Sequence, residues 1–153
     1  MMTPQDLRAL LQDEAQRWIG TPYHHQGCVH GAGVDCLMLL VAVFKAVGAL
    51  PAAFDPRPYA PQWHLHRSEE VYLAGLDTLL RPLGDGEPLQ AGDVVVWRFG
   101  RTFSHAGLIV QRAAALEVVH ALADAREVTQ TRLDDAPLTG REMRAFTLFA
   151  EVA

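Results

Sequence analysis

The segment that most constrains this chain begins at Asp35, where a glycine-rich polar stretch gives way to an apolar run that ends at Gly48. Asp is a preferred N-cap and glycine a preferred residue after a helix end, so the run predicts a buried helix. Cys36 then lies in the first turn, where unpaired N–H groups and the helix dipole are expected to lower a thiol pKa and to hold an oxyanion. The sequence therefore indicates that Cys36 is a nucleophile. The alternative interpretation is that Cys36 is simply a small apolar residue in the core.

Size and charge exclude several classes of protein. A chain of 153 residues, half of them hydrophobic and 20% charged, fits a single globular domain over residues 1–153. The net charge of −5 and the scattered Lys and Arg residues argue against a nucleic-acid surface. No run reaches the ~18 apolar residues of a membrane span, and the first residues do not read as a secretory signal. We expect a protein made in the cytoplasm, without a membrane span, in which Cys28 and Cys36 are reduced.

The pattern of apolar residues changes along the chain from helical to extended. A first helix is predicted from the N-cap Thr3, with an inward stripe from Leu7 to Ile19 that includes Leu10, and another helix is predicted after Ser68. Short β-branched and aromatic runs then predict strands. These strands cover residues 93–99, 104–111, 116–122, 126–133 and 143–149. The chain is therefore predicted to be α+β, with N-terminal helices packed on a mostly antiparallel sheet.

The loop from Gly20 to Gly33 is rich in glycine, which indicates close approach of the backbone to another part of the molecule. It carries metal-ligand residue types, but their spacing matches no tetrahedral site, so no metal or cofactor is expected. These residues are His24, His25, Cys28 and His30. Tyr23 precedes the helix and could donate a hydrogen bond to an oxyanion; packing is its other interpretation.

Two histidines on neighbouring predicted strands supply the base that a cysteine nucleophile needs. If Gln111 opposes Leu116 across the intervening turn, parity puts His105 and His120 diagonally on one face of the sheet. Ile109 and Val118 share that face, so we expect it to be the face that packs on the helices. One imidazole would then act as base and the other would fix its tautomer, which predicts a Cys–His enzyme.

Several sequence blocks, in this order, resemble the NlpC-type cell-wall peptidases, which are papain-like cysteine peptidases of bacteria and their phages. The blocks are Trp18 to Tyr23, Val34-Asp35-Cys36, Leu89 to Val95, Ser104 to Val110 and Val119-His120-Ala121. The resemblance implies a papain-like fold with a five- to six-stranded sheet. It also implies that Cys36 is the nucleophile, His105 the base and then acid, and His120 the residue that orients His105, and that Tyr23 helps at the oxyanion.

The resemblance further implies a substrate and a reaction. It places Asp35 and Ser104 among the substrate-binding residues, with Asp35 receiving the free amine of a peptide stem. Members of the family typically cleave the bond between D-glutamate and a diamino acid in peptidoglycan stem peptides, through a thioester acyl-enzyme. No cofactor is implied.

One departure from the family pattern concerns the residues after the nucleophile. Many members carry Ser-Gly there, whereas this chain has Leu37-Met38, which resembles the phage tail-associated branch. With no export signal in the sequence, the hypothesis is a virion tail enzyme that acts at the bacterial cell wall and contacts other phage tail proteins. The alternatives are a papain-like amidase or acyltransferase on a non-wall substrate, and a catalytically inert structural tail component.

Overall fold

A computed structural model describes residues 1–57 and 79–149; the helix predicted after Ser68 lies outside them. The described helices are α1 (Pro4–Arg17) and α2 (Cys36–Ala46). The described strands are β1 (Cys28–Val29), β2 (Gly33–Val34), β3 (Arg81–Pro82), β4 (Val94–Phe99), β5 (Thr102–Arg112), β6 (Ala115–Leu122), β7 (Glu127–Arg132) and β8 (Met143–Thr147). No helix among the described residues is long and apolar enough to cross a bilayer.

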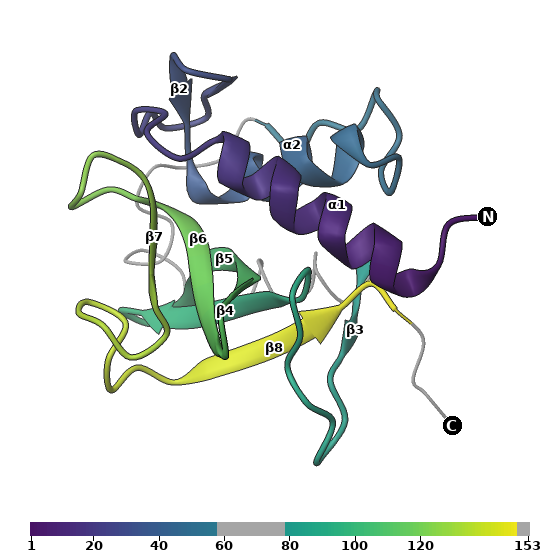
Figure 1. Cartoon of the computed structure of the whole chain (residues 1–153). Helices are drawn as coiled ribbons and strands as arrows, with labels where there is room; N and C mark the ends of the chain where they lie inside the picture. Colours follow the sequence, from purple (N-terminus) through teal and green to yellow (C-terminus); the bar gives the residue numbers. More distant parts are fainter. Residues whose placement is uncertain (58–78, 150–153) are drawn as a thin grey trace.

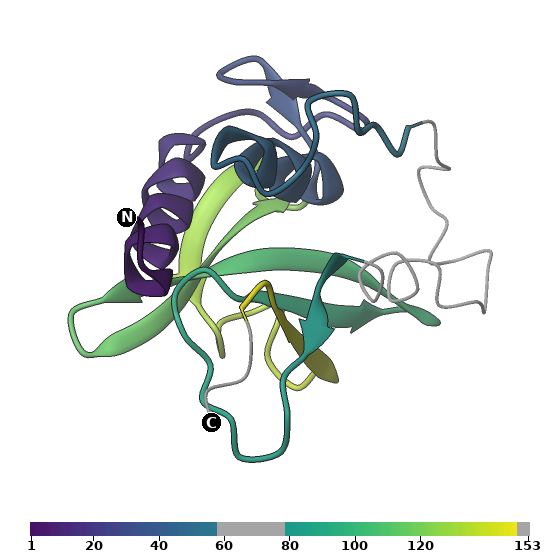
Figure 2. The same cartoon turned by 90° about the vertical axis from the view of Figure 1, so that its right-hand side faces the viewer.

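The main sheet is antiparallel throughout and has the strand order β3-β8-β4-β5-β6-β7. Both helices lie on one side of it, as Figures 1 and 2 show. Strands β1 and β2 form a separate small hairpin in the loop between the helices. The predicted α+β class, with helices on an antiparallel sheet, is confirmed.

Helix α1 begins where the sequence predicts. The Thr3 hydroxyl accepts the Asp6 N–H, and the Asp6 carboxylate accepts the Thr3 N–H, which is a complete capping box. Leu11 and Ala15 are fully buried, but Leu10 and Ile19, both predicted to point inward, are 42% and 45% exposed. The inward stripe of α1 is therefore narrower than the sequence pattern suggests.

The two faces of the sheet have different partners. One face, with Leu108, Val110 and Val119, joins the core residues of both helices. The opposite face carries Ile109 and Val118, which pack in a second cluster with Val95, Trp97 and Leu138. The expectation that the helices cover the Ile109 and Val118 face is therefore wrong. Parity predicts which residues share a face, but both faces of these strands are apolar, so it does not say which one the helices cover.

A buried ion pair connects α1 to the sheet. Arg8 Nη1 lies 2.8 Å from Asp93 Oδ1, and the Asp93 side chain is fully buried. The Thr147 hydroxyl donates to the same oxygen at 2.6 Å, and Arg8 Nη1 also donates to the Ala91 carbonyl at 2.9 Å. Leaving one buried charge unpaired costs about 3–5 kcal/mol. This pair therefore fixes where α1 lies over the start of β4 and the end of β8.

Candidate active site

Asp35 sets the start of α2 and so the position of Cys36. Its Oδ1 accepts the Met38 N–H at 2.9 Å as the N-cap, which confirms the predicted start of the helix. Its Oδ2 accepts the Gln26 N–H at 2.8 Å, so the carboxylate also holds the preceding loop against the helix. Asp35 is buried, and each of its oxygens bonds a backbone N–H.

The glycines of the loop before α2 allow it to fold back on itself. A Cβ at Gly33 would lie 2.8 Å from the His24 Cβ, and one at Gly27 would lie 2.9 Å from the Gly33 backbone. The Gly27 N–H donates to the His24 carbonyl at 2.8 Å. The close approach that the sequence predicts is therefore between parts of this loop, which delivers the chain to Asp35.

The sulfur of Cys36 lies against the backbone on both sides of His105. Cys36 Sγ donates to the Ser104 carbonyl at 3.6 Å, and the Ala106 N–H stabilises its thiolate form. The pairing of β5 gives the reason. It pairs with β4 through His105, but its pairing with β6 ends at Leu108 opposite Val119. The N-terminus of α2 therefore occupies the edge of β5 that β6 leaves open.

His105 and His120 form a hydrogen-bonded pair, as the strand parity predicts. His105 Nε2 lies 2.8 Å from His120 Nδ1, and His120 Nε2 lies 3.0 Å from the Thr131 hydroxyl oxygen. The predicted register of Gln111 opposite Leu116 is confirmed. If Nε2 of each ring donates toward Thr131, His120 Nδ1 accepts from His105 and His105 keeps Nδ1 as its free acceptor. This nitrogen is the one nearest the His105 backbone, against which the thiol lies.

The environment of the pair is apolar and tightly packed. The Trp97 ring centroid lies 5.9 Å from that of His105 and 6.4 Å from that of His120. A Cβ at Gly107 would lie 2.4 Å from Val118 Cγ2 and 3.0 Å from the His120 Cβ. Gly107 therefore lets β6 approach β5 closely enough for the two imidazoles to meet.

The structure does not join all the predicted catalytic groups by hydrogen bonds. Within residues 1–57 and 79–149, the thiol of Cys36 donates to the Ser104 carbonyl, and no hydrogen bond joins it to the His105 ring. Both imidazoles contact Trp97, which belongs to the cluster on the face that the helices do not cover, so the expectation that they project toward the helices is also wrong. The proposed chemistry needs the thiol proton to reach Nδ1 from the edge of β5, and such contacts often tighten only when substrate binds.

Burial keeps the Cys36 thiol and the His105 imidazole neutral in this structure. Burial, and then the Asp35 carboxylate, raises the pKa of the Cys36 thiol to about 12, against the effect of the N–H groups of Ala106, Leu37 and Cys36. Burial also lowers the pKa of His105 to about 3, helped by His120 and Arg141, and the pKa of His120 to about 4. The lowered thiol pKa expected at a helix N-terminus is therefore wrong for this resting state, because desolvation outweighs the helix.

Tyr23 lies near the start of α2, because its backbone forms a bridge with Val34, two residues before Cys36. Burial raises the Tyr23 pKa, and Cys36 and then Asp35 add to the rise, so the phenol stays a neutral donor. Its hydroxyl makes no hydrogen bond within the part of the chain that the structure describes. The N–H groups of Cys36 and Leu37 in the first turn of α2 complete a set of donors around the sulfur.

Thr131 is the residue of this site that the sequence interpretation missed. It lies opposite Val118 in the pairing of β6 with β7, so it is on the same face as His120 and close enough to bond its Nε2. The same alternation of side chains, applied to the pairing of β6 with β7, predicts that Thr131 shares a face with His120.

The loop residues with metal-ligand side chains do not converge. His30 Nε2 contacts the Arg17 carbonyl oxygen at 2.7 Å, and His25 Nδ1 lies 3.7 Å from Asp35 Oδ2. Among the described residues, no group of three or more His, Cys, Asp or Glu side chains is placed to hold a metal ion. Both Cys28 and Cys36 are free thiols in this structure.

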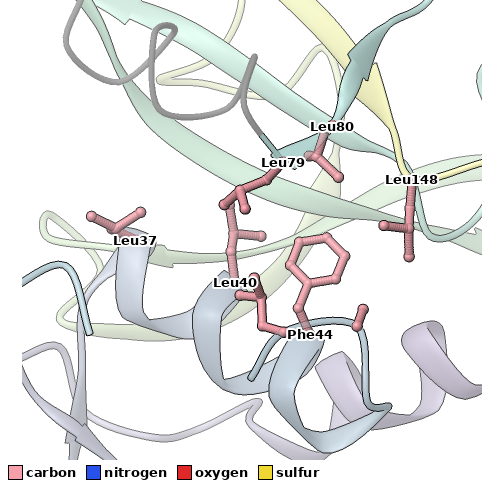
Figure 3. Close-up of a pocket in the computed structure, with 8 residues that line it drawn as sticks. Leu37, Leu40, Phe44, Leu79, Leu80 and Leu148 are labelled. Carbon is pink, nitrogen blue, oxygen red and sulfur yellow. The ribbon is translucent and has the colours of Figure 1, made fainter. Parts of the chain in front are cut away.

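An apolar pocket along α2 explains the two residues after Cys36 in terms of packing. Leu37 lines one end of this pocket (Figure 3), and Met38 is 1% exposed in the core. Other lining residues are Leu40, Phe44, Leu79, Leu80 and Leu148. Leu37-Met38 therefore buries apolar surface where Ser-Gly would leave space.

Two helices on one face of a six-stranded antiparallel sheet are the fold of solved NlpC/P60 domains. The NlpC/p60 domain of the peptidoglycan hydrolase SagA shares this fold, with a TM-score of 0.61 and 17% identity over 92% of this chain and 97% of that one. A protein of the NLP/P60 family from Staphylococcus aureus, described as similar to a lipoprotein, has a TM-score of 0.62 and 17% identity over 99% of this chain but 44% of its own.

An N-acetylmuramoyl-L-alanine amidase from Bacteroides uniformis also has this fold, with a TM-score of 0.58 and 12% identity over 92% of this chain and 98% of that one. No protein-family model matches the sequence, and no curated protein matches it either. The likeness therefore establishes the fold of this chain.

The buried imidazoles predict that stability falls in mild acid. Free histidine titrates near pH 6.5, but folding lowers the pKa of His105 to about 3 and that of His120 to about 4, so the unfolded chain binds more protons between these values. The free energy of unfolding should therefore drop as pH falls below about 6.5, by about 1.4 kcal/mol per pH unit for each proton. Urea unfolding from pH 5 to 8 measures this.

The control for this slope is the exposed histidine His30. His30→Gln should keep the slope, and the double variant His105→Gln with His120→Gln should flatten it. An unchanged slope in the double variant would assign the acid sensitivity to other groups.

The resting thiol should alkylate slowly. Because the thiolate is the reacting form and burial raises the Cys36 pKa to about 12, the iodoacetamide rate should climb about tenfold per pH unit through pH 10. Mass spectrometry of a Cys28→Ala protein isolates this rate, and Cys36→Ala gives the background. A rate that levels off below pH 8 would mean that a thiolate–imidazolium pair already exists at rest.

Proposed function

We propose that this protein is a cysteine peptidase that hydrolyses the peptide stems of bacterial peptidoglycan. The observation that carries the proposal is the meeting of the Cys36 sulfur with the backbone around His105, whose ring is held by His120 and Thr131. The likeness in fold to a peptidoglycan hydrolase and an N-acetylmuramoyl-L-alanine amidase supports a wall substrate. The proposed mechanism needs no metal or cofactor.

The proposed reaction proceeds through a thioester. Cys36 Sγ attacks the scissile carbonyl carbon while its proton passes to His105 Nδ1, and the carbonyl oxygen becomes an oxyanion that the N–H groups of Cys36 and Leu37 and the Tyr23 hydroxyl stabilise. The C–N bond then breaks as His105 returns the proton to the leaving amine. Water attacks the thioester, gives a proton to His105, and releases the carboxylate; the sulfur takes the proton back. His120 and Thr131 hold the imidazole in the required tautomer.

The bond that we propose as the target joins D-glutamate to a diamino acid, with Asp35 and Ser104 on the substrate side of the site. Asp35 lies beside the nucleophile and is the nearest carboxylate in sequence, which suits a role near a stem amine. Its two oxygens already bond backbone N–H groups, so a bound amine would add a contact to one of them.

Removing the proposed nucleophile or base should abolish turnover. Cys36→Ala and His105→Ala should each lower the rate of muropeptide cleavage by at least about 10³-fold, because each removes a group that acts in the transition state. His120→Ala should cost less, because water can replace part of its hydrogen bond. Mass spectrometry of the released amine ends measures cleavage, and His30→Ala is the matched control. Full activity of Cys36→Ala would exclude the proposed chemistry.

We further propose that the protein is carried on a phage tail and acts as the tail opens the wall. The support is the Leu37-Met38 pair, which resembles the tail-associated branch of the family and which the structure uses as packing residues. Quantitative proteomics of purified particles should find the chain at a fixed copy number relative to tail proteins. Its loss on particle purification would contradict this location.

One observation favours a second candidate, an inert structural tail component. The resting thiol has a raised pKa and bonds a carbonyl, as expected of a packed cysteine. The two candidates are distinguished by activity. An inert component would cleave no muropeptide at any pH at which the protein remains folded.

A further inference from the structure

Arg141 lies on an aromatic ring that contacts the proposed base. Its guanidinium carbon is 3.7 Å from the centroid of the Phe99 ring, and this ring centroid is 5.1 Å from that of His105. The two separations place the guanidinium less than 9 Å from the imidazole centroid. Arg141 is exposed, so its outer edge faces solvent beside the site.

The guanidinium is held in place by neutral groups. Arg141 Nε donates to the Pro137 carbonyl at 2.7 Å, and Nη1 donates to the Arg98 carbonyl at 3.2 Å. Two hydrogen bonds and a stacked ring fix the plane of the side chain before any ligand arrives, which lowers the entropy lost on binding.

Arg141 also lacks a carboxylate partner among residues 1–57 and 79–149. Most other described arginines lie within 4.0 Å of a carboxylate oxygen, including its neighbours Arg98 and Arg144, which both pair with Glu142. In a chain with a net charge of −5, a fixed and unneutralised guanidinium beside the base is suited to bind an anion.

We propose that Arg141 binds a free carboxylate of the substrate and makes the protein selective for stem peptides that are not amidated at this position. The inference rests on the proposed function and names the substrate class of that same site. A glutamyl residue has two carboxyl groups at the ends of a short carbon chain. When one forms the scissile bond near Cys36, the other is free or amidated, and the inference assigns this second group to Arg141.

Phe99 gives this contact its strength. The ring covers one face of the guanidinium and also contacts His105, so an apolar group shields part of the Arg141 charge from water close to the imidazole. The charge already acts on His105, whose pKa it helps to lower after burial and His120. A bound carboxylate would neutralise that effect, which couples recognition of the substrate to the basicity of His105.

The test compares two synthetic stem peptides that differ only in a free or amidated D-glutamyl carboxyl group. Wild-type protein should cleave the free form with a kcat/KM about 10- to 100-fold higher, the range expected for a charge-assisted hydrogen bond. Arg141→Gln should lose this preference by slowing cleavage of the free form alone. Arg112→Gln is the matched control, because it removes an equal charge at the far end of β5, where Arg112 pairs with Glu117.

A second measurement does not depend on turnover. Calorimetry on the Cys36→Ala protein should show the free peptide binding about 10- to 100-fold more tightly than the amidated one, with the difference removed by adding Arg141→Gln. The Arg112→Gln change should leave the difference intact.

The outcomes separate this inference from the proposed function. Equal cleavage and binding of the two peptides by wild-type protein, or an equal loss on both in Arg141→Gln, would overturn the role of Arg141 and leave a stem peptidase in which Arg141 only secures the segment before β8. If wild-type protein neither cleaves nor binds either peptide, the proposed function fails, and the inference fails with it.

Discussion

The site depends on a buried neutral imidazole that must find a hydrogen-bond partner on a neighbouring strand. His105 is 7% exposed and His120 is fully buried, and an unbonded ring nitrogen at this depth would cost about 1–3 kcal/mol. The series from His105 through His120 to Thr131 satisfies both nitrogens of His120 and Nε2 of His105 across β5, β6 and β7, and leaves His105 Nδ1 as the acceptor without a partner among the described residues. A register shift of one residue would move His120 to the other face of the sheet. The register of β5 and β6 therefore determines whether the two imidazoles can meet.

Local patterns predicted much of this arrangement. The caps at Thr3 and Asp35 are short-range hydrogen bonds between residues three apart in the chain, so the local sequence is enough to predict them. The pairing of His105 with His120 follows from the length of one turn and from the alternation of side chains along a strand. The missed Thr131 follows from the same rule applied once more.

Features that depend on distant parts of the chain were not predictable in this way. Arg8 and Asp93 meet only after the sheet has folded, and both faces of the central strands are apolar, so the sequence does not say which face the helices cover. The thiol pKa is a balance between the first turn of α2, which lowers it, and burial with Asp35, which raises it. The effect of the helix start can be predicted from the sequence, but the effect of burial cannot, because burial is a property of the whole fold.

This balance also explains why Cys36 and His105, the proposed nucleophile and base, are both neutral at rest. Separating a proton from a thiol with a pKa of about 12 onto an imidazole with a pKa of about 3 is strongly unfavourable in the resting protein. The first-turn N–H groups also favour negative charge on the thiol, but burial and Asp35 outweigh them, so in the proposed mechanism their main effect falls on the oxyanion of a bound carbonyl. A substrate carboxylate at Arg141 would raise the basicity of His105 at the same moment. The neutral pair is therefore consistent with a site in which substrate binding itself completes the catalytic arrangement.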